Sequence, residues 1–185
     1  MRQETITYTL YKYDELSEKA KEKVIEKFYD FNIDNEWWDG SYEGFKEDLK
    51  EIGLECKTFY FSLDRDYNIE ANSLRVDDIN KFVRSFDKKV KDSVISAAEI
   101  CLEHHTGRNS WSTFTVNYDI PDRCPKLQKA VNNLVDACNE KLKDVLEGFL
   151  SSLQKEYDYL TSREAIEEGI RCNEYEFLES GEMYK

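Results

Sequence analysis

The sequence contains little of what makes linkers, disulfide frameworks or membrane spans. It has two Pro and seven Gly in 185 residues, which leaves little room for long linkers. Its five cysteines are scattered without a CxxC pair, a pattern typical of reduced thiols in a cytosol. No uncharged apolar run approaches the ~18 residues that a membrane span needs, and the first residues lack the apolar stretch of a signal peptide. We therefore expect a cytoplasmic protein without a membrane partner.

Familiar catalytic and metal-binding motifs are also missing. There is no Gly-rich phosphate loop, Ser nucleophile elbow or HExxH helix. A zinc site can be drawn from the two histidines, His104 and His105, with Cys101 and Cys124, but this spacing matches no usual ligand pattern. Imidazoles beside the last carbonyls of a helix are the simpler interpretation. We predict no catalytic residue, no metal site and no cofactor.

One group of carboxylates keeps a catalytic alternative open. Asp64, Asp66 and Glu70 have the residue types that hold a divalent cation in a metal-dependent nuclease. However, such sites often have a Lys two residues after the last carboxylate, and this chain has none there. A solvated turn explains Asp64 and Asp66 equally well. A metal-dependent nuclease is therefore an alternative to the non-catalytic interpretation.

Aromatic residues and negative charge are abundant. Aromatic residues make up 14% of the chain, which favours a folded protein over a disordered acidic one. The net charge is −13 and is unevenly placed, with fourteen acids against six bases in residues 14–55 and nine against four in residues 153–185. Such a surface repels nucleic acid and attracts basic partners.

Hydrophobic periodicity predicts an α+β fold, with short antiparallel strands from both chain ends, a helical layer and two long central helices. We expect one domain over residues 1–185, with a helix-rich elaboration at 74–150. The length of the amphipathic central helices is compatible with a homodimer. The predicted strands are 5–13, 57–63, 68–72 and 111–118, with a terminal hairpin near 175–184. One helix is predicted to begin near Ser17 and another near Thr161. The remaining predicted helices span 35–52, 76 to near 107, and 125–160.

The helix predicted at 35–52 has the clearest functional pattern. Its apolar residues step by three and four, so they share one side of the helix. The other side carries a row of acids that rise about 5–6 Å at each step, comparable to neighbouring phosphates of a nucleic acid. Trp37 falls beside both faces, where it would anchor an interface. The predicted partner-binding residues are Glu36, Trp37, Asp39, Glu43, Glu47 and Glu51.

A plainer interpretation of the same helix stays open. A solvated surface helix also carries acids opposite its apolar stripe, with Lys46 and Lys50 forming local pairs. In that case Trp37 covers the core and takes no part in an interface. Whether the chain itself touches DNA also stays open. The candidate bases for such contact lie in the near-neutral middle: Lys88, Lys89, Lys91, Arg123, Lys126 and Lys129.

Several motifs at the two chain ends resemble a group of small phage and gut-bacterial proteins that are labelled antitoxins of toxin–antitoxin stability systems. The recurring pieces are Asp14-Glu15-Leu16-Ser17, Glu36-Trp37-Trp38, Ile52-Gly53, Asp64-Arg65, Tyr157-Asp158-Tyr159-Leu160-Thr161 and Asn173-Glu174-Tyr175-Glu176-Phe177. The resemblance covers about half the chain. The middle, roughly residues 74–150, is longer and more helical than in that group. No functional residue is carried over, because no catalytic motif accompanies the match.

The resemblance implies a mobile-element protein that acts in the host bacterial cytoplasm on a nucleic-acid enzyme. Acidic phage proteins of this size include anti-CRISPR inhibitors, some of which block Cas9 by occupying surfaces meant for DNA. The leading expectation is therefore an inhibitor of a host defence nuclease, of the Cas9-blocking type, that mimics nucleic acid through its acidic surface. The alternatives are an antitoxin that neutralises a basic toxin, the metal-dependent nuclease, and a structural virion protein.

Overall fold

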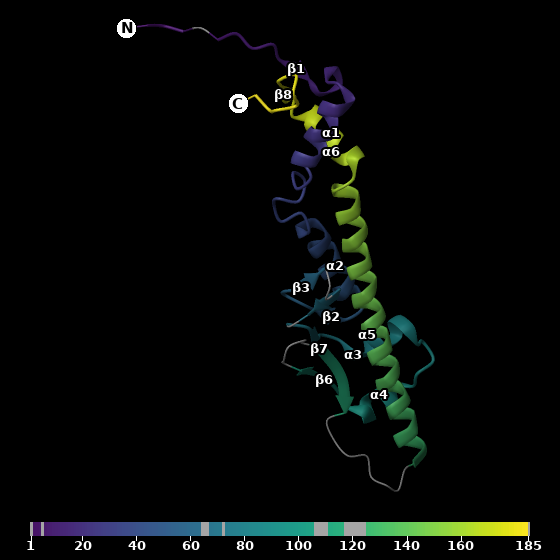
Figure 1. The fold of residues 1–185 in the computed structure, drawn as a ribbon. Coiled ribbons are helices and arrows are strands. Elements are labelled where there is room, and N and C mark those ends of the chain that lie inside the picture. The colour runs from purple at the N-terminus through teal and green to yellow at the C-terminus, as the bar shows by residue number, and fades with distance from the viewer. Residues whose placement is uncertain are drawn as a thin grey trace. The chain divides into compact units, whose positions relative to one another are not determined.

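The computed structural model describes residues 2–4, 6–63, 67–71, 73–105, 111–116 and 125–184. The predicted α+β class is confirmed, since the described residues form six α-helices and small antiparallel strand pairs (Figure 1). The chain divides into two compact units. The terminal unit comprises Met1–Trp37 and Lys155–Lys185, and the central unit comprises Trp38–Gln154. The single domain and its elaboration at 74–150 stay a prediction.

The terminal unit brings the two chain ends together. Its elements are β1 (Tyr11–Lys12), the 3-10 helix η1 (Tyr13–Glu15), α1 (Glu18–Lys27), the last residues of α5 (Pro125–Leu160), α6 (Arg163–Cys172) and β8 (Glu176–Phe177). β1 pairs antiparallel with β8, as predicted for strands from both ends. The strand predicted at 5–13 is nevertheless much shorter among its described residues. β8 offers only a two-residue partner, and η1 begins directly after Lys12.

Local signals place both helices of the terminal unit. The Ser17 hydroxyl accepts a hydrogen bond from the Ala20 amide, and the Ser162 hydroxyl accepts one from the Ala165 amide, each at 3.3 Å. Thr161 does not cap α6, because its hydroxyl donates to the Tyr157 carbonyl at 2.8 Å. The two helices share a buried apolar cluster formed by Tyr13, Leu16, Ala20, Val24, Phe28, Ile166, Ile170 and Phe177.

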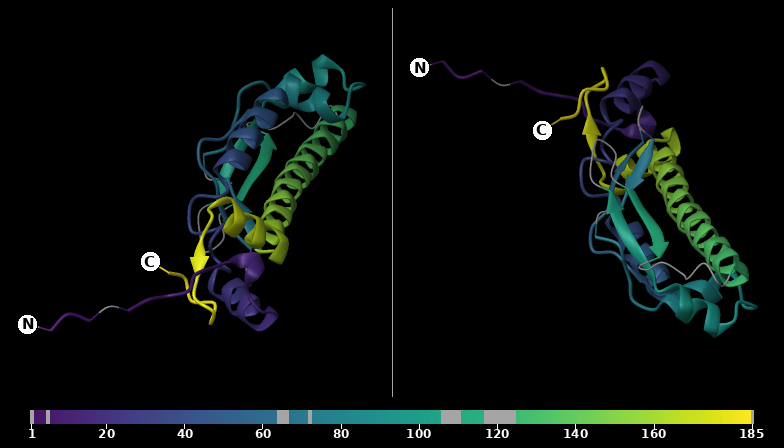
Figure 2. Two further views of the ribbon diagram at one scale, coloured as in Figure 1. Left: turned by 90° about the horizontal axis from the view of Figure 1, so that it is seen from above. Right: turned by 90° about the horizontal axis from the view of Figure 1, so that it is seen from below.

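The central unit combines helices with three antiparallel strand pairs, β2–β5, β3–β4 and β6–β7. Its elements are α2 (Asp39–Glu51), β2 (Leu54–Glu55), β3 (Tyr60–Ser62), β4 (Asn68–Glu70), β5 (Arg75–Val76), α3 (Ile79–Phe86), α4 (Asp92–Ala98), β6 (Ile100–His105), β7 (Trp111–Val116) and most of α5. The β6–β7 hairpin lies along α5 (Figure 2). The Asn139 side chain holds the two together, since it accepts from the Phe114 amide at 2.6 Å and donates to the Phe114 carbonyl at 3.1 Å.

One of the two long central helices is confirmed and the other is wrong. α5 begins at Pro125, as predicted, and runs for 36 residues. The helix predicted from 76 to near 107 is instead α3, α4 and β6 within the described residues, so the interpretation of His104 and His105 as a helix end is wrong. Asp87 ends α3 in an extended conformation, with a φ of −134°, and Glu99 ends α4 in the left-handed region, with a φ of 37°. Residues 100–105 then become a strand because β7 supplies a hydrogen-bonding partner.

Candidate functional site

The inner side of α2 is held by aromatic packing within the central unit. Phe45 and Leu49 are buried, and the Phe45 ring stacks on Phe149 with centroids 3.9 Å apart. The Tyr42 hydroxyl donates to the Phe59 carbonyl at 3.2 Å. These contacts fix the rotation of α2 about its axis, so the opposite side of the helix faces solvent.

The outer side of α2 carries four of the predicted acids, which we call the acidic row. Its members are Asp39, Glu43, Glu47 and Glu51, and all four are exposed. They are spaced four residues apart, so the row extends about 18 Å along the helix at 1.5 Å per residue. The structure thus brings these four carboxylates onto one side of one helix.

One member of the acidic row has a basic neighbour. The Lys46 ammonium lies 2.6 Å from Glu43 Oε1, and this hydrogen bond lowers the pKa of the Glu43 carboxyl. The local pairing expected of a solvated helix is therefore confirmed for Lys46. An exposed pair of this kind contributes little to stability. It keeps Glu43 ionised and leaves the row with a net negative charge.

Glu36 and Trp37 lie outside α2. The helix begins at Asp39 rather than Asn35, because the chain first makes a turn in which the Trp37 amide donates to the Asn35 carbonyl at 2.7 Å. Both residues belong to the terminal unit. Glu36 is exposed, and Trp37 is half-buried with its ring centroid 5.9 Å from that of Tyr157. They therefore do not extend the acidic row, and their role in binding stays a prediction for the terminal unit.

α2 also contains two glycines, Gly40 and Gly44, which the pattern of acids and apolar residues did not indicate as functional. A Cβ added at Gly40 or Gly44 meets no atom within 4 Å, so neither glycine is required by packing. Each costs the helix about 1 kcal/mol relative to Ala. Being one and five residues after Asp39, they lie beside the acidic row and leave the helix backbone open to a partner. Their spacing of four inside an amphipathic stretch was the signal available in the sequence.

The residues of the two metal-site alternatives are mostly outside the described part of the chain. This holds for Asp64, Asp66 and Cys124, and for the side chains of the two histidines. Glu70 lies in β4 and is half-buried. Cys101 Sγ lies 3.2 Å from the hydroxyl oxygen of Thr115. Within the described residues, no three His, Cys, Asp or Glu side chains come together as a metal site.

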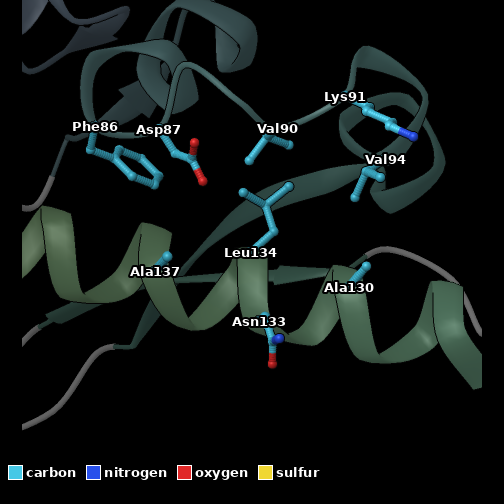
Figure 3. A pocket seen from close by; sticks show the side chains of 9 residues that line it. All are labelled: Phe86, Asp87, Val90, Lys91, Val94, Ala130, Asn133, Leu134 and Ala137. Atoms are coloured by element: carbon cyan, nitrogen blue, oxygen red, sulfur yellow. The ribbon is translucent and has the colours of Figure 1, made fainter.

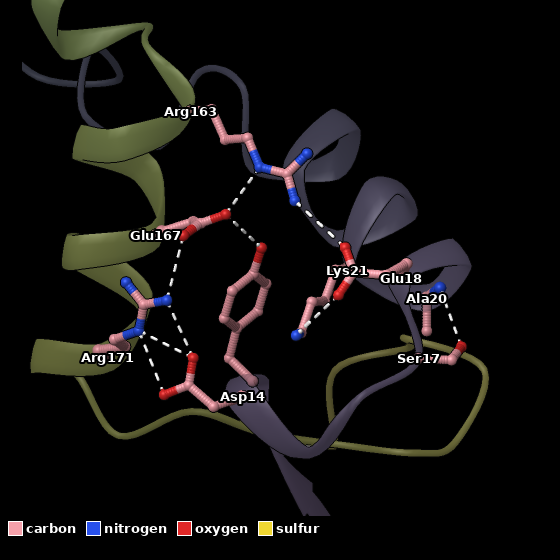
Figure 4. Close-up of polar contacts among 9 residues, drawn as sticks. Asp14, Ser17, Glu18, Ala20, Lys21, Arg163, Glu167 and Arg171 are labelled. Carbon is pink, nitrogen blue, oxygen red and sulfur yellow. Dashed lines mark hydrogen bonds and ion pairs between the residues drawn. The ribbon is translucent and has the colours of Figure 1, made fainter.

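A second polar cluster, in the terminal unit, is structural (Figure 4). The buried Tyr13 hydroxyl donates to Glu167 at 3.0 Å, and Arg163 and Arg171 donate to the same carboxylate at 2.7 and 3.1 Å. Arg171 also binds Asp14 at 2.9 Å. Burial, and then the Glu167 carboxylate, raise the pKa of Tyr13 to about 12. The partners of these groups lie within the cluster, so it joins η1 to α6.

No family model, curated protein or solved structure matches this chain. None of the helices in the described parts of the chain has a stretch long and apolar enough to cross a membrane. Structural support for a function therefore comes from the charge and geometry of the sites described above.

Proposed function

We propose that this protein inhibits a host defence nuclease of the Cas9 type by binding the basic surface that the nuclease uses for nucleic acid. The observation that carries the proposal is the acidic row of α2, with four exposed carboxylates opposite the buried Phe45 and Leu49. The choice of a host nuclease rests on the resemblance of the chain ends to phage proteins.

Binding would substitute carboxylates of α2 for phosphates of DNA. Successive acids of the row are about 6 Å apart along the helix axis, and each faces an Arg or Lys of the nuclease. Gly40 and Gly44 carry no side chains beside the row, so a partner meets no side chain of α2 at these two positions. Such complementarity raises the association rate more than the final affinity and weakens with salt.

An order-of-addition assay tests this function. Purified Cas9 with its guide is mixed with the protein either before or after the target DNA is loaded, and DNA cleavage is measured. We expect loss of cleavage only when the protein is added first, because bound DNA already covers the basic surface. No loss in either order, at a large excess of the protein, contradicts the proposal and favours the antitoxin alternative. A neighbouring gene that is toxic alone and rescued by this protein would then identify that alternative.

Charge-reversal variants test whether inhibition depends on the acidic row itself or only on the net negative charge of the protein. We expect Glu43→Lys, Glu47→Lys and Glu51→Lys together to raise the concentration needed for half inhibition at least tenfold, with an unchanged circular dichroism spectrum. The matched control is Asp136→Lys, Glu140→Lys and Asp144→Lys on α5, which are also exposed, spaced by four and in the central unit. Both variants change the net charge equally. Equal loss of inhibition in the two variants would contradict a specific role for α2.

A further inference from the structure

A groove in the central unit lies between α5 and the segment that joins α3 to α4 (Figure 3). Its volume is about 240 Å³. The lining is mainly apolar, and Asp87, Lys91 and Asn133 supply its polar groups. The apolar side chains come from both sides of the groove: Phe86, Val90 and Val94 on one side, and Ala130, Leu134 and Ala137 on the other.

Positive charge predominates along the segment that joins α3 to α4, in a protein whose net charge is −13. Residues 84–94 contain four bases and only two acids. Both acids are engaged locally, since Asp87 accepts a hydrogen bond from the Lys89 amide at 2.8 Å and Asp92 pairs with Arg84. The excess positive charge around the groove is therefore not neutralised by these two carboxylates.

Five lysines supply this charge: Lys88, Lys89, Lys91, Lys126 and Lys129, all exposed. None of them forms an ion pair with a residue that the structure describes. Lys126 is four residues before Ala130, and Lys129 is four residues before Asn133. In a helix this spacing places each lysine one turn from a lining residue on the same side. Bases thus lie on both walls of the groove, and the exposed Asp136, directly before Ala137, adds one acid to the α5 wall.

We infer that this groove docks a segment of a partner protein that carries a large apolar side chain flanked by carboxylates. The apolar walls accommodate the side chain, whose transfer from water drives binding. The lysines pair with the flanking carboxylates, which fixes the position of the segment. Phosphates of nucleic acid would use the lysines but leave the apolar walls exposed to water, so a protein segment fits the groove better. This surface is chemically opposite to the acidic row and is independent of the proposed function.

Selection from a randomised 12-residue peptide library on the full-length protein tests the inference. We expect selected peptides to combine Asp or Glu with Leu, Phe or Met. Two variants weaken their binding at least tenfold: Ala130→Phe with Ala137→Phe, which fills the groove, and Lys88→Glu, Lys89→Glu and Lys91→Glu, which reverse its charge. The matched control is Lys19→Glu, Lys23→Glu and Lys27→Glu, three exposed lysines of α1, which leaves the affinity within twofold.

Three results would overturn the inference. One is the absence of enriched peptides, and another is binding that neither groove variant changes. The third is binding of a 20-nucleotide poly-dT probe that the lysine variant abolishes and the groove-filling variant does not, with no acidic peptide selected. That result assigns the lysines to nucleic acid. Since none of these readouts involves a nuclease, they are distinguishable from failure of the Cas9 assay.

Discussion

Tyr13 shows how one residue joins segments that are far apart in the sequence. Its side chain is 2% exposed, and its hydroxyl reaches Glu167 in α6. The Arg171 guanidinium lies 5.4 Å from the ring centroid and the Lys21 ammonium 5.9 Å from it, within the range of cation–π attraction. The aromatic pattern of the sequence predicted a strand residue here, and nothing in that pattern indicated the partner 154 positions away.

We predict that Tyr13→Phe lowers the free energy of unfolding by about 1–2 kcal/mol, because the buried hydroxyl donates to the half-buried carboxylate of Glu167. Urea unfolding followed by circular dichroism measures this change. The control is Tyr29→Phe in the same unit, since Tyr29 is 46% exposed. Equal stability of the two variants would show that the Tyr13 hydrogen bond contributes nothing.

The same cluster predicts a loss of stability in acid. The hydrogen bond from Arg163 lowers the pKa of Glu167, and that from Arg171 lowers the pKa of Asp14. A carboxyl whose pKa is lower in the folded protein stabilises it at neutral pH. An unfolded glutamate takes up its proton near pH 4.3. The contribution to stability is therefore lost as the pH falls from about 4.3 through the lower pKa of the folded protein. The free energy of unfolding, measured from pH 7 to pH 3, should therefore fall more steeply for the native chain than for Glu167→Gln. Parallel curves would contradict this prediction.

At the scale of elements, the end of α2 depends on one glycine. Gly53 has a φ of 82°, and a Cβ there would lie 2.3 Å from the Asp78 carbonyl oxygen. The Gly53 carbonyl also accepts from the amides of Asp77 and Asp78, each at 3.0 Å. Gly53 therefore forms a left-handed C-terminal cap directly after the helix predicted at 35–52, and it also sets the approach of the chain to α3.

We predict that Gly53→Ala destabilises the protein by at least about 1–2 kcal/mol, the cost of a left-handed conformation with a side chain. The clash with Asp78 adds to this cost. The control is Gly148→Ala, because Gly148 lies inside α5 and a Cβ there meets nothing within 4 Å. That variant should raise stability by up to about 1 kcal/mol. Thermal unfolding measures the change in melting temperature of each variant. We expect a decrease for Gly53→Ala and an increase for Gly148→Ala, and a change in the same direction for both would contradict the prediction.

At the scale of the whole molecule, self-repulsion accompanies the charge of −13. Compact packing brings the acids closer together than in the unfolded chain, so screening by salt favours the folded state. We predict that the melting temperature rises by a few degrees between 20 and 500 mM NaCl, which corresponds to roughly 1 kcal/mol for a chain of this size. The triple reversal of Glu43, Glu47 and Glu51 leaves a net charge of −7 and should show a smaller rise. An equal or larger rise would contradict self-repulsion as the cause.

The sequence predicted correctly those features that depend on interactions between residues close together in the chain, and it failed where residues far apart in the chain interact. Ser17, Gly53 and Pro125 act within a few residues of themselves, and the helix ends predicted beside them are confirmed. The last helix was predicted to begin near Thr161, and its cap is the next residue, Ser162. The helix predicted from 76 to near 107 was wrong because its apolar residues keep a helical spacing even where the backbone changes to a strand. The spacing of apolar residues indicates only which side chains are buried, and a helix and a strand can both bury side chains.

The candidate surfaces differ in the same way. The acidic row lies on one helix, so its four members were predictable from spacing and amphipathicity, whereas the start of α2 depended on a turn that the spacing does not reveal. The apolar groove has walls about forty residues apart in the chain, and no periodicity relates them.

Helix caps, the length of α5 and the charge were thus determined by the sequence alone, because they arise from local hydrogen bonds and composition. The pairing of β6 with β7, the partner of Tyr13 and the groove were decided by tertiary structure, because each requires long-range packing that brings distant residues into contact.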